Sequence, residues 1–369
     1  MNRMKLGEIL SVKHGWAFKG EYFAEDGEQS ILTPGNFFEK GGFKPNNGKE
    51  RYYTGTYPKE YLCHKGDLIV AMTQQAEGLL GSTALVPENN KYLHNQRIGL
   101  ITCDEKRLNK LFAYYLFMTK SVREQLERSS SGTKVKHTSP EKIYDVEVEI
   151  PDVISQQKIA NLLWFIDEKI ANNNAINDNL EQQMHLIFEN MMAKAATHKL
   201  SGEYTIAQNL ATVVTGKEDA NFSVPNGKYK FFTCSNTPLS CDEYVFDSSS
   251  ILIAGNGDFN VKHYSGKFNA YQRTYVLTPD KKYFGLLYLA SLYRINSFKS
   301  RSSGSIVKFI TKSDVENIPV FIPNDRFYLQ ELNKLIYLQE QNKLENELLV
   351  NLRDWLLPML MNGQATISD

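Results

Sequence analysis

The chain has 369 residues, of which 42% are hydrophobic and 23% charged, and a formal net charge of zero, values typical of a globular protein of about two domains. It contains no run of 18 consecutive apolar residues, which excludes a transmembrane helix, and its first eleven residues lack the apolar segment of a signal peptide. We therefore expect a cytoplasmic protein that does not bind a membrane.

The first 151 residues, here called module 1, predict a domain of mixed α and β structure. Short β-type runs occur at 30–32, 67–72 and 98–102, with Gly, Asn and Pro between them. A helical stretch at 111–127 follows these runs. Module 1 is therefore expected to have strands first and a helix near its end.

Residues 152–196 predict one long helix with a heptad seam. Ser155 is the expected N-cap, and a helix over 155–192 would be about 55 Å long at ~1.5 Å per residue. Asn173 is expected to be the one polar position in the seam. The apolar seam positions, spaced mostly three and four apart, are Ile159, Leu163, Ile166, Ile170, Ile176, Leu180, Met184, Ile187 and Met191.

The second half of the chain predicts the same order of elements. Residues 197–323, here called module 2, contain β-type runs at 229–233, 251–254 and 275–277 and a helical stretch at 284–297. Residues 324–369 predict a second long helix and a tail, closed by Pro358 and Gly363. Its apolar positions are Leu332, Ile336, Leu344, Leu348 or Leu349, Leu352 and Leu356.

The order of these elements reflects an internal duplication. Residues 112–151 align without a gap on 284–323, with nine identities in forty positions that include a Ser-Ser-Gly tripeptide. Two apolar seams must also be covered in water, so the simplest arrangement pairs the two helices antiparallel. The alternative, in which each helix packs on its own module, stays open. The fold class predicted is α+β, with two repeated domains joined and separated by two long antiparallel coiled-coil helices.

The charges are segregated between modules and helices. Module 1 has 21 basic and 19 acidic residues and module 2 has 14 and 10, whereas the helical segments 152–196 and 324–369 have 3 and 6, and 4 and 7. The modules are thus slightly basic and the helices acidic. This pattern favours an anionic partner for the modules.

Catalytic and metal-binding signatures are missing from the sequence. Four cysteines, at 63, 103, 234 and 241, form no CxxC pair, so we expect free thiols and no metal site. Pro151-Asp152 with Asp167-Glu168-Lys169 superficially resembles a metal-dependent nuclease pattern. However, Asp167 and Lys169 lie two apart on a helix and point to different faces, so a solvated helix face is expected instead. The chain is therefore not predicted to be an enzyme.

Basic and hydroxyl-bearing loops in both modules favour contacts with DNA. A Ser-Ser-Gly-Thr/Ser loop followed by Val-Lys offers hydroxyls, backbone N–H groups and lysines to phosphates. Base recognition would need Asn, Gln or Arg side chains that follow the matched strands. The predicted phosphate contacts are Ser131, Thr133, Lys134, Lys136, Arg301, Ser303, Ser305 and Lys308, and the predicted base contacts are Asn36, Gln74, Gln75, Arg97, Asn236, Asn256, Asn260 and Arg273. Solvated loops and ordinary turn residues are the alternative interpretation of each.

The whole layout resembles the specificity subunit of type I restriction–modification systems. The most specific stretch runs from Ser130-Ser131-Gly132-Thr133 through Ile150-Pro151 to Gln156-Gln157-Lys158-Ile159-Ala160 and Ile166-Asp167-Glu168-Lys169-Ile170. The second copy keeps Ser303-Gly304-Ser305, Lys308 and Ile322-Pro323, but Leu329-Gln330-Glu331-Leu332 replaces the glutamine motif.

The resemblance implies a non-catalytic subunit that recognises a bipartite target in double-stranded DNA. Two methyltransferase subunits, which bind S-adenosylmethionine, would dock on the helices, and restriction subunits that use ATP and Mg would join them. No cofactor is implied for this chain itself. Two alternatives remain: the subunit of a related bifunctional restriction–methylation system, or a coiled-coil scaffold that binds protein or carbohydrate.

Overall fold

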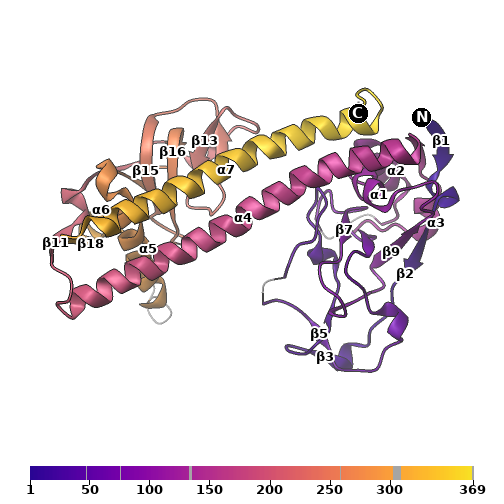
Figure 1. The fold of residues 1–369 in the computed structure, drawn as a ribbon, viewed down its shortest axis with the longest axis horizontal. Helices are drawn as coiled ribbons and strands as arrows, with labels where there is room; N and C mark the ends of the chain where they lie inside the picture. Colours follow the sequence, from indigo (N-terminus) through magenta and orange to yellow (C-terminus); the bar gives the residue numbers. More distant parts are fainter. Residues whose placement is uncertain (47, 75, 133–134, 258, 302–308, 368–369) are drawn as a thin grey trace. The chain divides into compact units, whose positions relative to one another are not determined.

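The chain forms two compact units in a computed structural model. Unit 1 comprises Met1–Lys169 and Leu349–Asp369, and unit 2 comprises Ile170–Leu348 (Figure 1). Each unit contains one module and parts of both long helices. Within the described residues no helix is both long and apolar enough to cross a membrane. The structure describes residues 1–369 except 47, 75, 133–134, 258, 302–308 and 368–369, and it does not describe the side chains of 299–301.

Unit 1 contains three antiparallel or mixed sheets, with strand orders β1–β10, β2–β9–β6–β7 and β3–β5–β4–β8. Its helices are α1 (Lys110–Leu116), α2 (Lys120–Ser129), α3 (Pro140–Tyr144) and the first part of α4 (Val153–Ala196). Its strands are β1 (Asn2–Lys5), β2 (Leu10–His14), β3 (Phe23–Ala24), β4 (Ser30–Ile31), β5 (Tyr52–Tyr53), β6 (Leu68–Ala71), β7 (Thr83–Leu85), β8 (Tyr92–Leu93), β9 (Ile98–Cys103) and β10 (Glu147–Ile150). The all-apolar β6 is buried along its whole length at the centre of its sheet.

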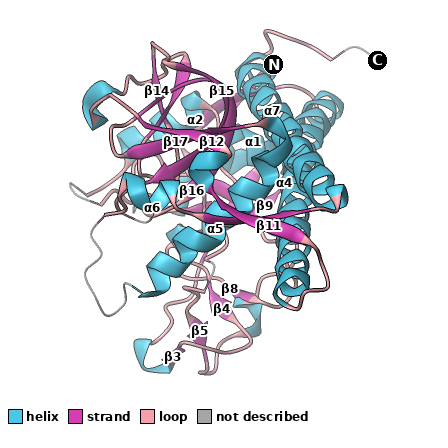
Figure 2. Ribbon diagram, turned by 90° about the vertical axis from the view of Figure 1, so that its left-hand side faces the viewer, coloured by secondary structure: helices cyan, strands magenta, loops and turns pink. Residues whose placement is uncertain are grey.

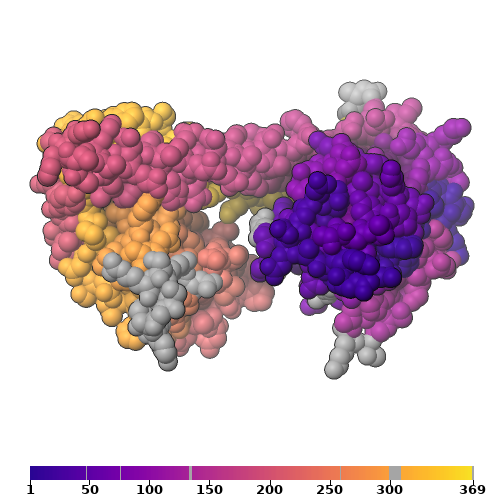
Figure 3. All heavy atoms as spheres, turned by 90° about the horizontal axis from the view of Figure 1, so that it is seen from below, coloured from indigo at the N-terminus to yellow at the C-terminus, as the bar shows by residue number. Residues whose placement is uncertain are grey.

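Unit 2 contains the small sheet β11–β18 and a larger sheet of order β12–β17–β15–β16–β13–β14. Helix α5 (Phe284–Arg301) packs on the larger sheet near α6 (Lys312–Glu316), and α7 (Arg326–Met361) follows β18 (Figure 2). The strands are β11 (Gly202–Ile206), β12 (Ala211–Thr215), β13 (Tyr229–Phe232), β14 (Leu239–Cys241), β15 (Phe246–Ala254), β16 (Val261–Ala270), β17 (Thr274–Pro279) and β18 (Pro319–Pro323). Figure 3 shows module 1 and module 2 each as a continuous body.

The duplication inferred from sequence extends to topology and hydrogen bonding. The order β2–β9–β6–β7 in unit 1 matches β12–β17–β15–β16 in unit 2. Ser139 and Thr311, 172 positions apart, are the N-caps of α3 and α6. Gly15 and Gly216 also occupy equivalent places, because both lie close against the backbone of a neighbouring segment. A Cβ atom added to either glycine would lie only 2.1 Å from a carbonyl oxygen of that segment. The two modules are therefore two copies of one fold, as the sequence predicted.

Three local predictions about helices were wrong. Pro358 does not close the second long helix, because it lies inside α7, which ends at Met361. The stretch 111–127 is not one helix, because it is divided into α1 and α2 with Thr119 as the N-cap of the second. Helix α4 begins at Val153, and Ser155 is not its cap: the Asp152 carboxylate accepts hydrogen bonds from the Ser155 N–H, at 3.0 Å, and from its hydroxyl, at 2.7 Å. An acidic cap lies favourably at the positive end of the helix.

The first turn of α4 is anchored to module 1 by Gln156, which is fully buried. Its Oε1 accepts from the Asn109 N–H at 2.8 Å, and its Nε2 donates to the Arg107 and Pro151 carbonyls at 3.0 and 2.9 Å. The glutamine of the sequence motif therefore joins the helix to its module. A hydrocarbon core of Ile159, Ala160 and Leu163 with the module's own residues completes this junction.

In unit 1 the two long helices meet through an ion pair. Arg353 of α7 donates to the Asp167 carboxylate of α4 at 2.8 Å, and the Tyr115 hydroxyl donates to the same carboxylate at 2.7 Å. Asp354 of α7 in turn accepts from Lys40 of module 1 at 3.1 Å. Asp167 is thus a partly buried contact residue, and the expectation that it lies on a solvated helix face was wrong.

In unit 2 the helices meet through a series of amides rather than a single polar position. The side chain of Asn173 donates to Glu345 at 2.7 Å and to Asn346 at 2.9 Å, and Asn342 donates to the Asn177 side chain at 3.0 Å. These contacts show that α4 and α7 run antiparallel within the unit, while their apolar residues pack on module 2 as well. The two long helices therefore pair with each other and also pack on the modules, so the two arrangements considered from the sequence occur together.

The polar contacts displace several residues that were predicted in the seam. Asn177 takes the buried place expected for Ile176, and Phe188 is buried instead of the half-buried Ile187. An uninterrupted heptad pattern misplaces these positions because a straight helix has 3.6 residues per turn and drifts relative to a 3.5-residue repeat. The seam positions that are instead 44–63% exposed are Ile176, Leu344, Leu348 and Leu352.

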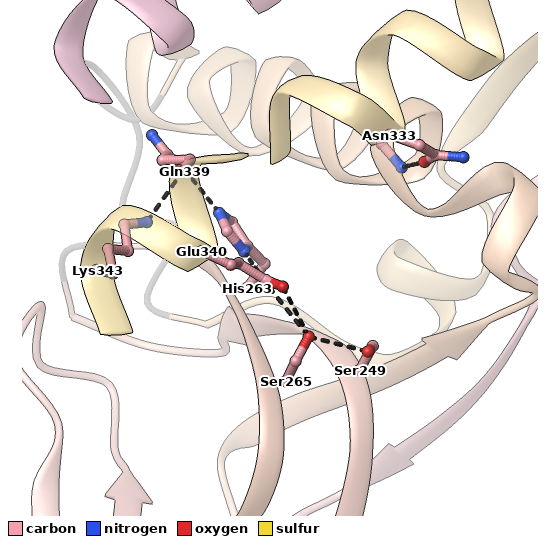
Figure 4. Close-up of polar contacts among 8 residues, drawn as sticks. Ser249, His263, Ser265, Asn333, Gln339, Glu340 and Lys343 are labelled. Atoms are coloured by element: carbon pink, nitrogen blue, oxygen red, sulfur yellow. Dashed lines mark hydrogen bonds and ion pairs between the residues drawn. The ribbon is translucent and has the colours of Figure 1, made fainter. Parts of the chain in front are cut away.

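Module 2 is joined to α7 by a buried histidine on β16. The His263 ring lies 2.9 Å from Glu340 and 3.0 Å from Gln339, and Ser265 donates to Glu340 at 3.0 Å (Figure 4). Burial acts to raise the pKa of Glu340, but hydrogen bonds from His263 and Ser265 and the charge of Lys343 hold it below its usual value. The carboxylate is therefore kept charged at this junction.

Candidate nucleic-acid interface

Three segments of module 1 converge at the end of β6. The Met72 N–H donates to the Arg97 carbonyl at 3.0 Å, and the Met72 carbonyl accepts from the Thr138 N–H at 2.9 Å. The Gln74 N–H donates to the Lys136 carbonyl, also at 2.9 Å. We call the resulting surface edge 1, formed by residues 73–74, 96–97, 131–132 and 135–138.

The same three segments converge in module 2. The Gly255 N–H donates to the Arg273 carbonyl at 2.8 Å, and the Gly255 carbonyl accepts from the Ile310 N–H at 2.8 Å. Thr138 and Ile310 are 172 positions apart, which is the offset of the duplicated segment. The corresponding surface, edge 2, is formed by residues 255–256, 272–273 and 309–310. The loops that the sequence singled out are thus brought together once in each module.

The structure places several predicted contact residues at these edges with accessible side chains. Arg97 and Ser131 are exposed on edge 1, and Gln74 and Lys136 are half-buried there. Lys136 forms an ion pair with Glu127 of α2. On edge 2, Arg273 is exposed and Asn256 half-buried.

Asn236 is exposed in a loop beside edge 2. Lys262 of β16 holds this loop by donating to the Thr233 carbonyl at 3.4 Å and to the Ser235 carbonyl. Burial lowers the pKa of Lys262. Lys262 therefore holds the start of the loop in place next to the exposed amide of Asn236.

Two of the predicted base contacts serve the fold instead, which corrects those predictions. Asn36 is only 3% exposed, and its side chain accepts from the Thr33 N–H at 2.8 Å and donates to the Lys44 carbonyl at 3.3 Å. The Asn260 amide donates to the Cys234 carbonyl at 2.8 Å, and its Oδ1 is buried. Neither side chain is free to reach a base.

The remaining predicted contacts cannot be placed on these edges. Gln75, Thr133, Lys134, Ser303, Ser305 and Lys308 lie outside the described residues, as does the side chain of Arg301. They stay predictions of sequence.

Sequence reasoning missed Arg123 of α2, a residue whose side chain holds the loop that follows β6. Its guanidinium donates to the Phe117 carbonyl at 2.5 Å, to the Gly78 and Leu80 carbonyls at 2.9 and 2.8 Å, and to the Glu39 carbonyl at 3.3 Å. Burial lowers the pKa of Arg123 to about 10. An arginine on a helical face gives no signal in sequence that its partners are the carbonyls of two distant loops.

A family model described as the type I restriction modification DNA specificity domain matches residues 1–182 and 210–351. The chain belongs to this family. The first range covers module 1 and the second covers residues 210–323 of module 2, each together with part of a long helix, in agreement with the repeated fold. The specificity-domain family therefore accounts for both copies of the module.

Three relatives of this family illustrate how far the similarity extends. The EcoDI specificity subunit of Escherichia coli is 36% identical over 164 residues, which are 42% of this chain and 37% of that protein. The MjaIX specificity subunit of Methanocaldococcus jannaschii is 22% identical over 304 residues, 70% of this chain and 69% of that protein. A crystal structure of the type I restriction-modification S subunit from M. genitalium shares the fold, with a TM-score of 0.65 and 18% identity over 100% of this chain and 96% of that one.

Proposed function

We propose that this chain is the specificity subunit of a type I restriction–modification complex and that each module recognises one half of a bipartite target in duplex DNA. The observation that supports this most directly is the repeated edge, where identical backbone contacts present an exposed arginine, Arg97 or Arg273, in each copy. Arginine is the side chain that most often forms bidentate contacts with guanine in the major groove. Two such edges suit a target with two recognised halves.

Phosphate contacts would supply most of the affinity that does not depend on sequence. Ser131 and Lys136 lie beside Arg97 on edge 1 and suit this role. The predicted contacts Thr133, Lys134, Arg301, Ser303, Ser305 and Lys308 belong to the same basic loops in the sequence. We propose them as further backbone contacts.

We also propose that two methyltransferase subunits dock on the long helices. Phe165 of α4 is 68% exposed and Tyr337 of α7 is 60% exposed, and the two are 172 positions apart. Large exposed aromatic side chains are costly in water and are enriched at the centres of protein interfaces. An equivalent aromatic in each repeat favours two equivalent docking surfaces.

The domain boundaries proposed are 1–151, 152–196, 197–323 and 324–369. S-adenosylmethionine would be bound by the methyltransferase subunits, and ATP and Mg by restriction subunits, while this chain contributes no catalytic residue. The complex would act in the cytoplasm.

Titration of duplex DNA with wild-type and arginine variants tests the proposal. We expect log K to fall with log[salt] with a slope of about −0.9 for each phosphate neutralised. Arg97→Ala should weaken discrimination at one half of the target by about 10-fold, and Arg273→Ala should do so at the other half, since one good base contact contributes about 1–3 kcal/mol. Arg51→Ala, at an exposed position of module 1 outside edge 1, is the matched control.

The rival functions give different results in the same titration. A scaffold that binds protein or carbohydrate would show no salt-dependent binding of duplex DNA. If both arginine variants weaken the same half of the target, the assignment of one half to each module is wrong. The subunits that co-purify distinguish a separate restriction subunit from a bifunctional partner.

A further inference from the structure

Edge 1 borders a polar hollow, which is lined in part by Arg97. Its volume is about 330 Å³, and no acidic side chain is among the described residues that line it. The hollow is formed where the end of β2 meets the three segments of edge 1. The polar residues lining it are His14, Thr73, Gln96, Arg97, His137 and Thr138.

Thr138 provides an unsatisfied polar group in this hollow. The residue is 8% exposed, and its hydroxyl is buried with no hydrogen-bond partner among the described residues. Its backbone N–H is already used by Met72. A buried hydroxyl without a partner costs about 1–3 kcal/mol, so such groups usually face a ligand or ordered water. The hollow thus offers a hydrogen-bond donor that lacks an acceptor.

Two histidines and an arginine give the hollow its charge. The His137 Nδ1 lies 3.1 Å from the Thr73 hydroxyl, which holds the ring at the edge, and the His14 Nδ1 lies 3.5 Å from the Gly15 carbonyl. Arg97 contributes a permanent positive charge. Histidine changes its charge between about pH 5 and 8. Protonation of either ring would add a positive charge to the hollow.

The lysines near the hollow are paired with carboxylates of their own. Lys136 faces Glu127 in an ion pair, and Lys13 on β2 is paired with Glu60. Glu141 of α3 interacts with the charge of His14: a hydrogen bond from Ser139 lowers the pKa of Glu141 most, and the charge of His14 contributes least. Burial lowers the pKa of His94 to about 4, so that ring stays neutral in this range.

Module 2 lacks the same groups at the equivalent positions. Phe309 and Ile310 replace His137 and Thr138 at the offset of 172, and Thr215 at the end of β12 replaces His14 at the end of β2. Arg273 of edge 2 corresponds to Arg97 and keeps its charge. Edge 2 consequently serves as a natural control for any property of the hollow.

We propose that the hollow of edge 1 binds a phosphodiester group of the DNA backbone, held by Thr138 and the protonated rings of His14 and His137, with the positive charge of Arg97 beside it. An unsatisfied hydroxyl, ionisable donors and the absence of a lining acid suit an oxyanion, and charge-assisted hydrogen bonds to phosphate are strong. This inference rests on the proposed recognition of DNA. DNA binding by module 1 is then coupled to proton uptake, whereas binding by module 2 is not.

Binding of the full-length chain to a mixed-sequence duplex, measured at pH 6 and pH 8 at one ionic strength, tests the proposal. We expect wild type to bind about 10-fold more tightly at pH 6, because each protonated histidine adds one charged contact. The double variant His14→Gln/His137→Gln should lose most of this difference and match wild type at pH 8. His64→Gln, at an exposed position of module 1 away from the hollow, should retain it.

Thr138→Val tests the buried hydroxyl separately. The variant has almost the same shape, so we expect binding about 5-fold weaker at both pH values with the pH dependence intact. If Thr138→Val binds like wild type, the hydroxyl does not contact the ligand and the proposal is overturned.

Inorganic phosphate, substituted for chloride at constant ionic strength, distinguishes a free phosphate site from a DNA contact. If the double variant loses binding of inorganic phosphate but binds the duplex with an unchanged pH response, the DNA assignment is wrong. If the chain binds no duplex at either pH, both this inference and the proposed function fail. If the duplex binds with the same pH dependence in wild type and double variant, only the hollow is misassigned.

Discussion

Units 1 and 2 contain the same backbone arrangement but hold it with different side chains. At edge 1 the loop after β6 is fixed by the buried guanidinium of Arg123, whereas the equivalent position 172 residues later is Ile295, fully buried in the apolar core of unit 2. Edge 1 has a polar hollow, and edge 2 has Phe309 and Ile310 in its place. The repeat therefore preserves the backbone geometry of the edge while its side-chain chemistry differs.

The contacts between module and helix differ in the same way. In unit 1, Lys40 of module 1 pairs with Asp354 of α7, and both groups are substantially exposed. In unit 2, His263 of module 2 is buried against Glu340 of α7. Exposed pairs contribute about 0–1 kcal/mol, whereas breaking a buried contact costs more. The comparison indicates that α7 is held more firmly to module 2 than to module 1 by polar contacts.

The largest effect is expected from Arg123→Met. The change leaves the Gly78, Leu80 and Glu39 carbonyls without their donor, and we expect it to destabilise the loop by about 3 kcal/mol. Hydrogen exchange followed by mass spectrometry should show about 100-fold less protection in peptides covering 74–81, with unit 2 unchanged.

Ile295→Met is the matched control in unit 2. This change conserves volume in an apolar core, so a cost below about 1.5 kcal/mol is expected, with no localised loss of protection. If both variants lose the same hydrogen-exchange protection, Arg123 and Ile295 stabilise their units to the same extent, and the contrast between the two units is wrong.

A smaller effect is expected when the exposed aromatic side chains of the long helices are removed. Phe165→Ala and Tyr337→Ala should each weaken binding of one methyltransferase copy by about 2 kcal/mol, the size of an interface hot spot. Native mass spectrometry of the complex should then show one methyltransferase instead of two at concentrations where wild type binds both.

Glu168→Ala, an exposed change on the same helix as Phe165, is the control and should leave two copies bound. If Phe165→Ala and Tyr337→Ala both retain two methyltransferase copies, the proposed docking surfaces are elsewhere.

The sequence allowed the duplicated modules, their main strands and the two helices to be predicted because these follow from apolar periodicity and from repeated local motifs. The same reasoning misplaced Ile176 and Leu344, since Asn173, Asn177 and Asn342 pair across the helices and displace apolar residues from the interface. Periodicity identifies an apolar face but not the polar partners that compete for it.

Candidate contact residues were harder to predict than the fold. Arg97 and Arg273 were predicted because each adjoins a matched strand, and both are exposed, so they stay candidates. Asn36 has the same residue type as a base contact, yet its amide is used in a turn of its own module. Thr138 and Arg123 depend on segments far away in the chain, so no local pattern marks them.

The most direct test of two independent recognition modules is a map of modified adenines. Residues 1–151 would be replaced by those of another family member, and the chimera expressed with the methyltransferase partner. We predict that one half of the methylated target changes while the other half keeps its sequence. A target that is unchanged, or one that changes in both halves, would contradict the account.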